Sequence, residues 1–249
     1  DVLAAAGDAV KIDCQGRTVL PGLNDSHMHL LMVGEVLSEA PISDSTSVED
    51  MIERCRKFAA ENPELVKNGM HSQGWNQDLF EKGKVRLPNR HDLDKISTEY
   101  PIMLERVCGH TCTLNTKALE LLGIGRNHPQ IYEGGTIEFE ADGNPSGYFT
   151  ENAVYEVRKI IPQSTIEEQK KSLLKAMKYC VEHGLTSVQA NDIGEMAEDR
   201  DALFQMYKEV YRDGLAPLRF RHQVCCMTKE HFRTYLEGEY RNKDQYDDM

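Results

Sequence analysis

The chain has 249 residues, 40% of them hydrophobic, and a formal net charge of −12 at pH 7. This length fits one large α/β domain or two smaller ones with a substantial core. A surface this acidic repels nucleic acids and anionic membranes, which argues against both as partners and favours a small-molecule ligand. No apolar stretch reaches membrane-spanning length, and the seven cysteines, which lack regular spacing, indicate reduced thiols in the cytoplasm.

The first predicted elements are strands on either side of a turn. Apolar residues around Gln15-Gly16 predict a hairpin over residues 9–20, and a short strand over 23–31 follows the turn at Pro21-Gly22. Thr46-Ser47-Val48-Glu49 has the pattern of a capping box, and apolar residues at helical spacing behind it predict a helix over 47–62.

The middle of the chain is less regular. Glycine, proline and asparagine interrupt short apolar segments over residues 63–163. We expect an elaborated insert there, with short strands near 102–104 and 136–139 and a helix near 116–122.

The last third of the chain has a regular pattern. A predicted helix that ends at Gly184 is followed at once by a strand over 185–190, and a helix over 200–212 is followed by a strand over 218–225. Helix, glycine and short apolar strand, twice in succession, are typical of βα units in a parallel sheet. A further helix is expected over 229–236.

Two histidines, separated by one residue, lie in the predicted strand over 23–31. Side chains alternate along a strand, so His27 and His29 should project to one side, with Cα atoms roughly 6–7 Å apart, close enough to hold one metal ion. Asp25 would lie on the same side and could accept a hydrogen bond from a histidine N–H. The alternative is that one histidine is a hydrogen-bonded core residue while the other faces solvent.

The string from Val19 to Leu30 resembles the first-strand motif of the metal-dependent amidohydrolase superfamily. Six further stretches, in chain order, resemble its YtcJ-like branch, which includes N-substituted formamide deformylase. They are Gly74-Trp75-Asn76, Pro88 to Asp94, Arg106 to His110, Asn115 to Leu119, Gly143 to Gly147 and Gly184 to Val188.

The resemblance implies a fold and a domain organisation. It implies a (β/α)₈ TIM-like barrel combined with a small β-sandwich. Residues 1–22 would be a remnant of the sandwich, and residues 23–249 the N-terminal part of the barrel, with a long insert at about 63–163 after the first strand. Because the sequence starts with Asp1 instead of Met and stops at Met249 after a polar run, we expect an internal piece of a longer protein.

The resemblance also implies a metal site. His27 and His29 would be first-strand ligands of a divalent ion, either Zn or else Fe, Mn or Ni. Because the predicted strands at 185–190 and 218–225 count as the second and third of the barrel, the other ligands and the general base are expected beyond Met249. These 249 residues alone would then be inactive.

Several residues in the matching stretches are candidate substrate contacts. His110 and Asn115 suit substrate orientation or carbonyl polarisation, although His110 could instead cap a turn. Trp75 would line a pocket or belong to the core. Asn76 stands where the branch has an aspartate, which puts an acid or base role in doubt and leaves packing against substrate.

Two carboxylates are further candidates. Glu151 matches a glutamate of the branch and could face the cleft and contact metal or substrate; as an acid at a helix N-terminus it would instead favour the helix dipole. Asp192 follows the predicted strand at 185–190, where it could contact a ligand or cap a helix.

The implied function is hydrolysis of non-peptide C–N bonds, in amides, formamides or cyclic amides, by a metal-activated water. Two alternatives stay open. One is a non-catalytic binding or regulatory protein that has kept the histidines, and the other is a related hydrolase of esters or lactones. A homo-oligomer is also possible, because an incomplete barrel leaves open sheet edges that can pair.

Overall fold

The computed structural model describes residues 7–193, 200–226 and 228–237. Its strands are β1 (Leu23–Met28), β2 (Met70–Trp75), β3 (Ile102–Arg106), β4 (Thr111–Leu114), β5 (Gly135–Phe139), β6 (Pro145–Glu151), β7 (Leu185–Ile193) and β8 (Arg219–Val224). Its helices are α2 (Leu30–Val36), α3 (Val48–Glu61), α4 (Pro63–Val66), α5 (Arg90–Leu93), α6 (Thr116–Leu122), α7 (Asn152–Arg158), α8 (Ile166–Glu182), α9 (Arg200–Arg212), α10 (Lys229–Glu237) and the 3-10 helix η1 (Gln77–Leu79).

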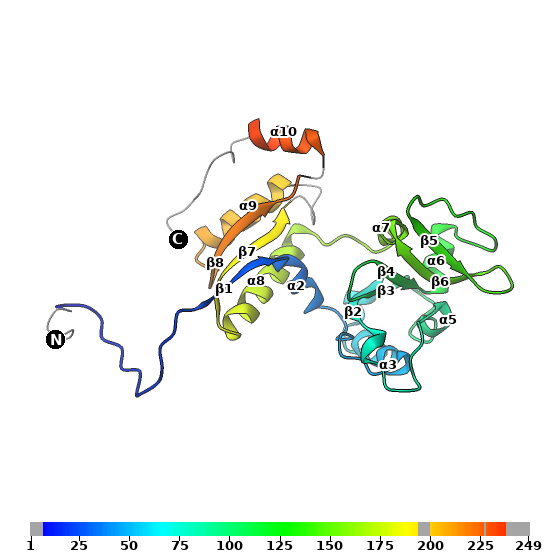
Figure 1. The fold of residues 1–249 in the computed structure, drawn as a ribbon, viewed down its shortest axis with the longest axis horizontal. Helices are drawn as coiled ribbons and strands as arrows, with labels where there is room; N and C mark the ends of the chain where they lie inside the picture. The colour runs from blue at the N-terminus through cyan, green and yellow to red at the C-terminus, as the bar shows by residue number, and fades with distance from the viewer. Residues whose placement is uncertain (1–6, 194–199, 227, 238–249) are drawn as a thin grey trace.

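The fold is mixed α/β, with two sheets (Figure 1). The first has the order β1-β7-β8, and all its strands are parallel. The second has the order β2-β3-β4-β6-β5 and is mostly antiparallel. Within the described residues neither sheet closes into a barrel. Over the same residues, no helix is both long and apolar enough to cross a membrane.

The first sheet confirms the predicted βα pattern. Helix α8 leads into β7 and α9 into β8, and their apolar sides pack with α2 against one face of the sheet. Val188 and Ala190 of β7 are buried on that face, whereas Ser187 and Gln189, which alternate with them, are only partly buried. This alternation leaves the opposite face of the sheet polar.

The second sheet has helices on both faces. Ile102 and Leu104 of β3 pack in one core with side chains of α3, and Met103 between them packs in another core with side chains of α6 and α7. The first of these cores already includes Ala40 and Ile42, so α3 and the segment before it pack with the second sheet.

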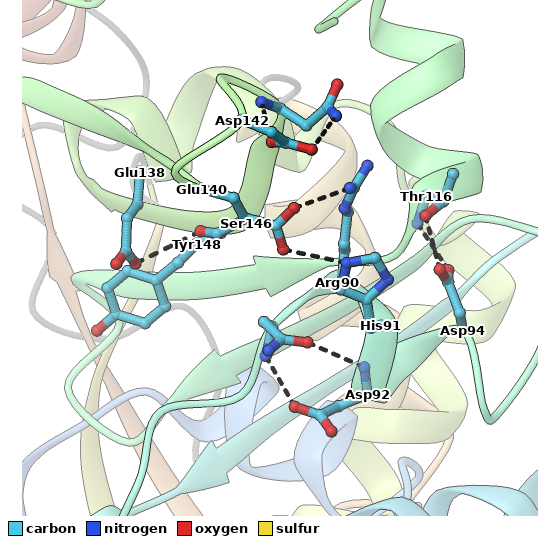
Figure 2. Close-up of polar contacts among 12 residues, drawn as sticks. Arg90, His91, Asp92, Asp94, Thr116, Glu138, Glu140, Asp142, Ser146 and Tyr148 are labelled. Atoms are coloured by element: carbon cyan, nitrogen blue, oxygen red, sulfur yellow. Dashed lines mark hydrogen bonds and ion pairs between the residues drawn. The ribbon is translucent and has the colours of Figure 1, made fainter. Parts of the chain in front are cut away.

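Two of the sequence stretches that carry the family resemblance meet in this part of the molecule. Figure 2 shows Arg90 and His91 of α5 against Glu140 of the β5–β6 connection, with Arg90 Nη2 at 2.9 Å and His91 Nε2 at 3.0 Å from its carboxylate oxygens. Gly147 in β6 has φ +91°, and a Cβ there would lie 2.4 Å from the Leu114 carbonyl oxygen of β4 and 2.9 Å from Arg90 Cβ of α5. Glycine is therefore needed where β6 passes α5.

The predicted hairpin over 9–20 is wrong. Within residues 7–22 the structure has no strand, only turns at residues 7–8 and 15–16. The second turn is closed by Arg17 N–H to the Cys14 carbonyl at 2.9 Å, and the segment extends away from both sheets (Figure 1). Val10 and Ile12 are 90% and 82% exposed. A lone hairpin is marginally stable in water, and nothing in the described residues covers its apolar side chains. The assignment of residues 1–22 to a sandwich remnant stays a prediction, and residues 7–22 contribute no strand to it here.

A charged network joins α2 and the segment after it to the second sheet. His71 of β2 contacts Glu39 through Nδ1 at 2.6 Å and Glu105 of β3 through Nε2 at 2.9 Å. Arg158 of α7 donates to both oxygens of Glu105, at 2.9 and 2.6 Å. Burial lowers the pKa of His71, but the two carboxylates outweigh it and raise that pKa to about 10. The imidazole is therefore charged at neutral pH and bridges two carboxylates.

Helix α2 is also held closely against α8. A Cβ on Gly34 would lie 2.0 Å from the Ser172 backbone carbonyl oxygen of α8, so no larger residue fits without moving one of the two helices. Glu35 follows it, and burial raises the pKa of Glu35 to about 7, with a further upward contribution from the Glu39 charge.

We predict that Glu35→Gln stabilises the protein at pH 8. A pKa raised above its unfolded value means that the stability linked to Glu35 is fully present below about pH 4.5 and is lost as pH rises through about 7. The variant should gain roughly 1–3 kcal/mol in urea unfolding at pH 8 and nothing near pH 4. Glu120→Gln, at an exposed position on α6, is the control. A gain that does not depend on pH would contradict the assignment.

We also predict that Gly34→Ala destabilises the fold by about 2–3 kcal/mol, because α2 and α8 must separate to admit the methyl group. Urea unfolding measures the loss. Gly125→Ala is the matched control, since a Cβ at Gly125 meets no atom within 4 Å and the residue has no positive φ. Equal stabilities of the two variants would show that the close contact between the helices is not rigid.

Candidate metal centre

The site lies at the carboxyl end of β1, where the strand is irregular. Asp25 pairs with Val188 and Met28 with Ala190, so β1 advances three residues while β7 advances two. The extra residue is a β-bulge. Because paired residues lie on the same face, Asp25 and Met28 both lie on the helix-covered face with Val188 and Ala190.

The bulge overturns the prediction that Asp25 shares the face of the histidines. Simple alternation of side chains does not apply across the bulge. The Asp25 carboxylate lies close enough to Cys180 of α8, behind the sheet, to add to the effect of burial in raising the pKa of the Cys180 thiol. Asp25 Oδ1 instead accepts the backbone N–H of His27 at 3.0 Å. Its carboxylate thus supports the backbone that carries the histidine.

The two histidines lie together, as the sequence predicts, but they do not both belong to the strand. β1 ends at Met28, and His29 is the residue before the first turn of α2, with φ −109° and ψ 85°. The ring centroids of His27 and His29 are 5.7 Å apart, with an angle of 81° between the ring planes. The turn from strand to helix therefore preserves the proximity that a longer strand was expected to provide.

Gln223 of β8 fixes the imidazole of His27. Its amide Nε2 donates to the Ser26 carbonyl at 3.0 Å, which turns Oε1 toward His27 Nδ1 at 2.7 Å. An amide oxygen can only accept, so Nδ1 of His27 carries a proton, and in the neutral ring Nε2 carries the lone pair. Gln223 also lies 3.4 Å from Gln189 Oε1, and this contact links the amide to β7. An imidazole oriented by an outer acceptor in this way is typical of metal sites.

Asp192 lies at the carboxyl end of β7 and is fully buried. Both of its oxygens are 3.2 Å from the Leu31 backbone N–H in α2, and Tyr207 of α9 donates its hydroxyl to Oδ2. Burial raises the pKa of Asp192 and outweighs the hydrogen bonds from Tyr207 and from the α2 backbone, which lower it. The structure therefore places Asp192 as a cap of α2, a helix distant in sequence, and not in an open loop.

Three other candidates have structural roles. Trp75 has no exposed surface and donates its indole N–H to the Leu104 carbonyl at 3.2 Å, inside the core of the second sheet. Asn115 is also buried and caps α6 through its Oδ1, which accepts the Ala118 N–H at 2.9 Å. Asn76 caps η1 and accepts a hydrogen bond from Arg106 at 3.2 Å. Their predicted substrate contacts find no support in these positions.

His110 and Glu151 form an exposed pair. His110 Nδ1 is 2.9 Å from Glu151 Oε2, and the two side chains are 57% and 56% exposed. The Glu151 backbone N–H donates to the His110 carbonyl at 2.7 Å, and Glu151 has φ +50°, a conformation that non-glycine residues rarely adopt. Backbone strain of this kind is concentrated at functional positions, so these two predicted residues stay candidates.

The histidine pair fits a divalent ion in donor chemistry. Imidazole nitrogen is a preferred ligand of Zn²⁺ and of other first-row metals, and His27 offers an Nε2 lone pair fixed by Gln223. Over the described residues, no group of three or more His, Cys, Asp or Glu side chains is arranged to hold an ion. Two imidazoles are therefore a partial ligand set.

Comparisons with known proteins identify the family of the chain. The model of the amidohydrolase family matches residues 11–246. The chain belongs to the amidohydrolase family. It is 29% identical over 209 residues to the putative amidohydrolase YtcJ of Bacillus subtilis (strain 168), which covers 84% of this chain and 38% of YtcJ. It is 33% identical over 156 residues to N-substituted formamide deformylase of Arthrobacter pascens, covering 60% of this chain and 27% of the deformylase.

A solved structure gives the same result. An uncharacterised metal-dependent hydrolase from Pyrococcus furiosus matches with a TM-score of 0.53 and 26% identity, over 82% of this chain and 37% of that one. This amidohydrolase chain therefore spans well under half the length of each of these relatives, and its likeness to a metal-dependent hydrolase extends over most of its own length.

Sequence analysis of this amidohydrolase missed Gln223 and Tyr207. Tyr207 lies within the predicted helix over 200–212 and Gln223 within the predicted strand over 218–225, and neither stood out by its residue type. The sequence does contain a signal for Gln223. The predicted strands over 23–31, 185–190 and 218–225 are parallel neighbours, so their carboxyl ends lie at one edge of the sheet. A polar residue near the end of the strand over 218–225 could have been placed beside His27 on that basis.

We predict that the His27 imidazole of this amidohydrolase chain is protonated on Nδ1 at pH 8 in the absence of metal. ¹⁵N NMR of the imidazoles measures the tautomer directly. Gln223→Leu should convert His27 to a tautomer mixture, and Gln223→Glu, which retains an oxygen acceptor, should preserve Nδ1–H. A proton on Nε2 in the wild-type protein would contradict the assignment.

Proposed function

We propose that this chain is the part of a metal-dependent hydrolase that holds the first two metal ligands, and that the whole enzyme cleaves non-peptide C–N bonds. The observation that carries the proposal is the pair His27 and His29, with ring centroids 5.7 Å apart at the carboxyl end of β1, and with one imidazole oriented by Gln223. Sites in parallel βα proteins gather at the carboxyl ends of the strands.

His27 Nε2 and one nitrogen of His29 would hold the ion. A divalent metal supplies Lewis acidity toward a substrate carbonyl and lowers the pKa of water to about 7. We propose zinc, because imidazole suits it well, with iron, manganese and nickel as alternatives on the same donor chemistry. Because the described residues hold no group of three or more side chains that could bind an ion, we propose that the remaining ligands, and the general base with them, come from elsewhere in the whole enzyme.

We also propose that β1, β7 and β8 are the first three strands of a (β/α)₈ barrel. Their parallel order, with the connecting helices α8 and α9 on one face, supports this, as does a polar opposite face suited to the barrel interior. The edge of β8 would then pair with a further strand, of a longer chain or of a second copy.

The substrate class is the less constrained part of the proposal. The name of the deformylase relative points to an N-substituted formamide or a related amide. The exposed pair His110 and Glu151 has the donors and acceptors to orient such a carbonyl group. Hydrolysis of an ester or lactone, and a non-catalytic binding or regulatory role, are the alternatives. A small-molecule substrate suits the acidic surface, and seven cysteines outside disulfides support a cytoplasmic location.

We predict that the intact protein, purified without chelator, contains about one equivalent of a divalent metal and that His27→Ala and His29→Ala each reduce the content to less than about one-tenth. Metal analysis of the purified protein measures the content. His231→Ala, at an exposed position on α10, is the control and should retain the metal. A wild-type protein that holds less than about one-tenth of an equivalent would contradict the proposal.

A panel of N-substituted formamides, simple amides, cyclic amides, esters and lactones separates the remaining alternatives. Metal-dependent release of amine supports the C–N hydrolase, whereas turnover of esters or lactones alone supports the related hydrolase. Full metal content without turnover of any member of the panel favours the binding or regulatory role.

A further inference from the structure

Helix α2 starts at the metal site without an N-cap of its own. The residue in the N-cap position is His29. Its side chain makes no capping hydrogen bond to the first turn of α2. The first turn carries Leu30, Leu31 and Met32, none of them acidic. The first N–H groups of a helix need partners, and the residues that usually supply them are Ser, Thr, Asp and Asn.

The missing cap is supplied by Asp192, 161 residues further along the chain. The Leu31 backbone N–H donates to the Asp192 carboxylate, with both oxygens at 3.2 Å. Its negative charge also faces the positive end of the helix dipole. The carboxylate therefore fixes the first turn of α2 relative to the end of β7, and His29 precedes that turn directly.

Tyr207 holds the carboxylate in place. Its hydroxyl donates to Asp192 Oδ2, and its fully buried ring stacks on Phe220 with centroids 4.5 Å apart and meets His222 edge-on at 4.8 Å. Phe220 and His222 both belong to β8, so Tyr207 of α9 links Asp192 of β7 to the neighbouring strand. A carboxylate anchored in this way has little freedom to rotate away from α2.

We propose that Asp192, anchored by Tyr207, is a positioning residue that sets His29 for metal binding, an inference that rests on the proposed function. Asp192 does not bind the metal or the substrate. It acts from behind the sheet through the backbone of α2, while Gln223 orients His27 from the polar face. The two ligands are thus positioned by different strands, His29 from β7 and His27 from β8.

The experiment uses the intact protein and three single variants, Tyr207→Phe, Asp192→Asn and the matched control Tyr211→Phe. Tyr211 lies one turn further along α9, and its hydroxyl donates to the Leu218 carbonyl at 2.9 Å, remote from Asp192. Each Tyr→Phe variant removes one hydroxyl hydrogen bond from the same helix. Competition with a chromophoric chelator gives the Zn²⁺ dissociation constant, the visible spectrum of the Co²⁺ form reports ligand geometry, and urea unfolding gives stability.

Tyr207→Phe and Asp192→Asn should weaken Zn²⁺ binding roughly 10- to 100-fold and change the Co²⁺ spectrum, whereas Tyr211→Phe should bind as the wild type does. Because Tyr207 acts through Asp192, a double variant that combines Tyr207→Phe with Asp192→Asn should bind Zn²⁺ no more weakly than Asp192→Asn alone. Unchanged Zn²⁺ affinity in Tyr207→Phe and Asp192→Asn, with a loss of stability like that of Tyr211→Phe, would overturn the proposal. So would additive effects in the double variant.

The metal-free protein keeps this test separate from the proposed function. Imidazole NMR resonances of His29 should shift or broaden in Tyr207→Phe and Asp192→Asn but not in Tyr211→Phe. If the wild-type protein binds no metal while these resonances respond as expected, the proposed function fails and the positioning of His29 stands. If they do not respond, Asp192 has no positioning role, whatever the metal content.

Discussion

The start of α2 directly after His29 is the constraint on which the site depends. If the strand continued through His29, both histidines would lie on one extended segment, and no tertiary contact at its end would hold His29 in place. Instead β1 stops at Met28 and the backbone turns into a helix whose first turn is capped by Asp192 from β7. The position of His29 is therefore set by tertiary contacts.

The same helix joins the site to the second sheet. Gly34 allows α2 to approach the backbone of α8 closely, and the segment after α2 carries Glu39, which binds the charged imidazole of His71. His71 in turn contacts Glu105, which Arg158 neutralises with two hydrogen bonds. Breaking a buried pair by removing one partner is costly, so the second sheet has a defined place relative to α2. The second sheet is thus packed against the helix that starts at the proposed metal site.

Local sequence patterns were sufficient for most elements. The helix at 116–122 was predicted with its observed bounds, and the helix predicted over 47–62 is observed as Val48–Glu61, with Ser47 as N-cap in place of Thr46. The strands at 185–190 and 218–225 have the predicted parallel order with the first strand. These elements follow from capping residues and apolar periodicity, which depend on near neighbours in the sequence.

What the sequence could not provide depends on distant neighbours. The bulge that turns Asp25 to the helix-covered face arises from the pairing register with β7, and alternation alone predicts the opposite face. The hairpin over 9–20 has the composition of strands but lacks a packing partner in the described residues. Asp192 was correctly recognised as a possible cap, yet the helix that it caps lies 161 residues earlier in the chain.

The contacts around the two histidines affect the free energy with which an incomplete set of two ligands would bind an ion. Two imidazoles alone bind an ion weakly, and any freedom in their positions would weaken binding further, because ordering a side chain on binding costs about 0.5–1.5 kcal/mol. Gln223 and Asp192 remove much of that freedom before an ion arrives, one through the ring of His27 and the other through the backbone beside His29. Both come from strands of the same sheet, so the first half of the site is ordered by the chain that contains it. Under the proposed function, ligands contributed from elsewhere would meet two imidazoles that are already in position.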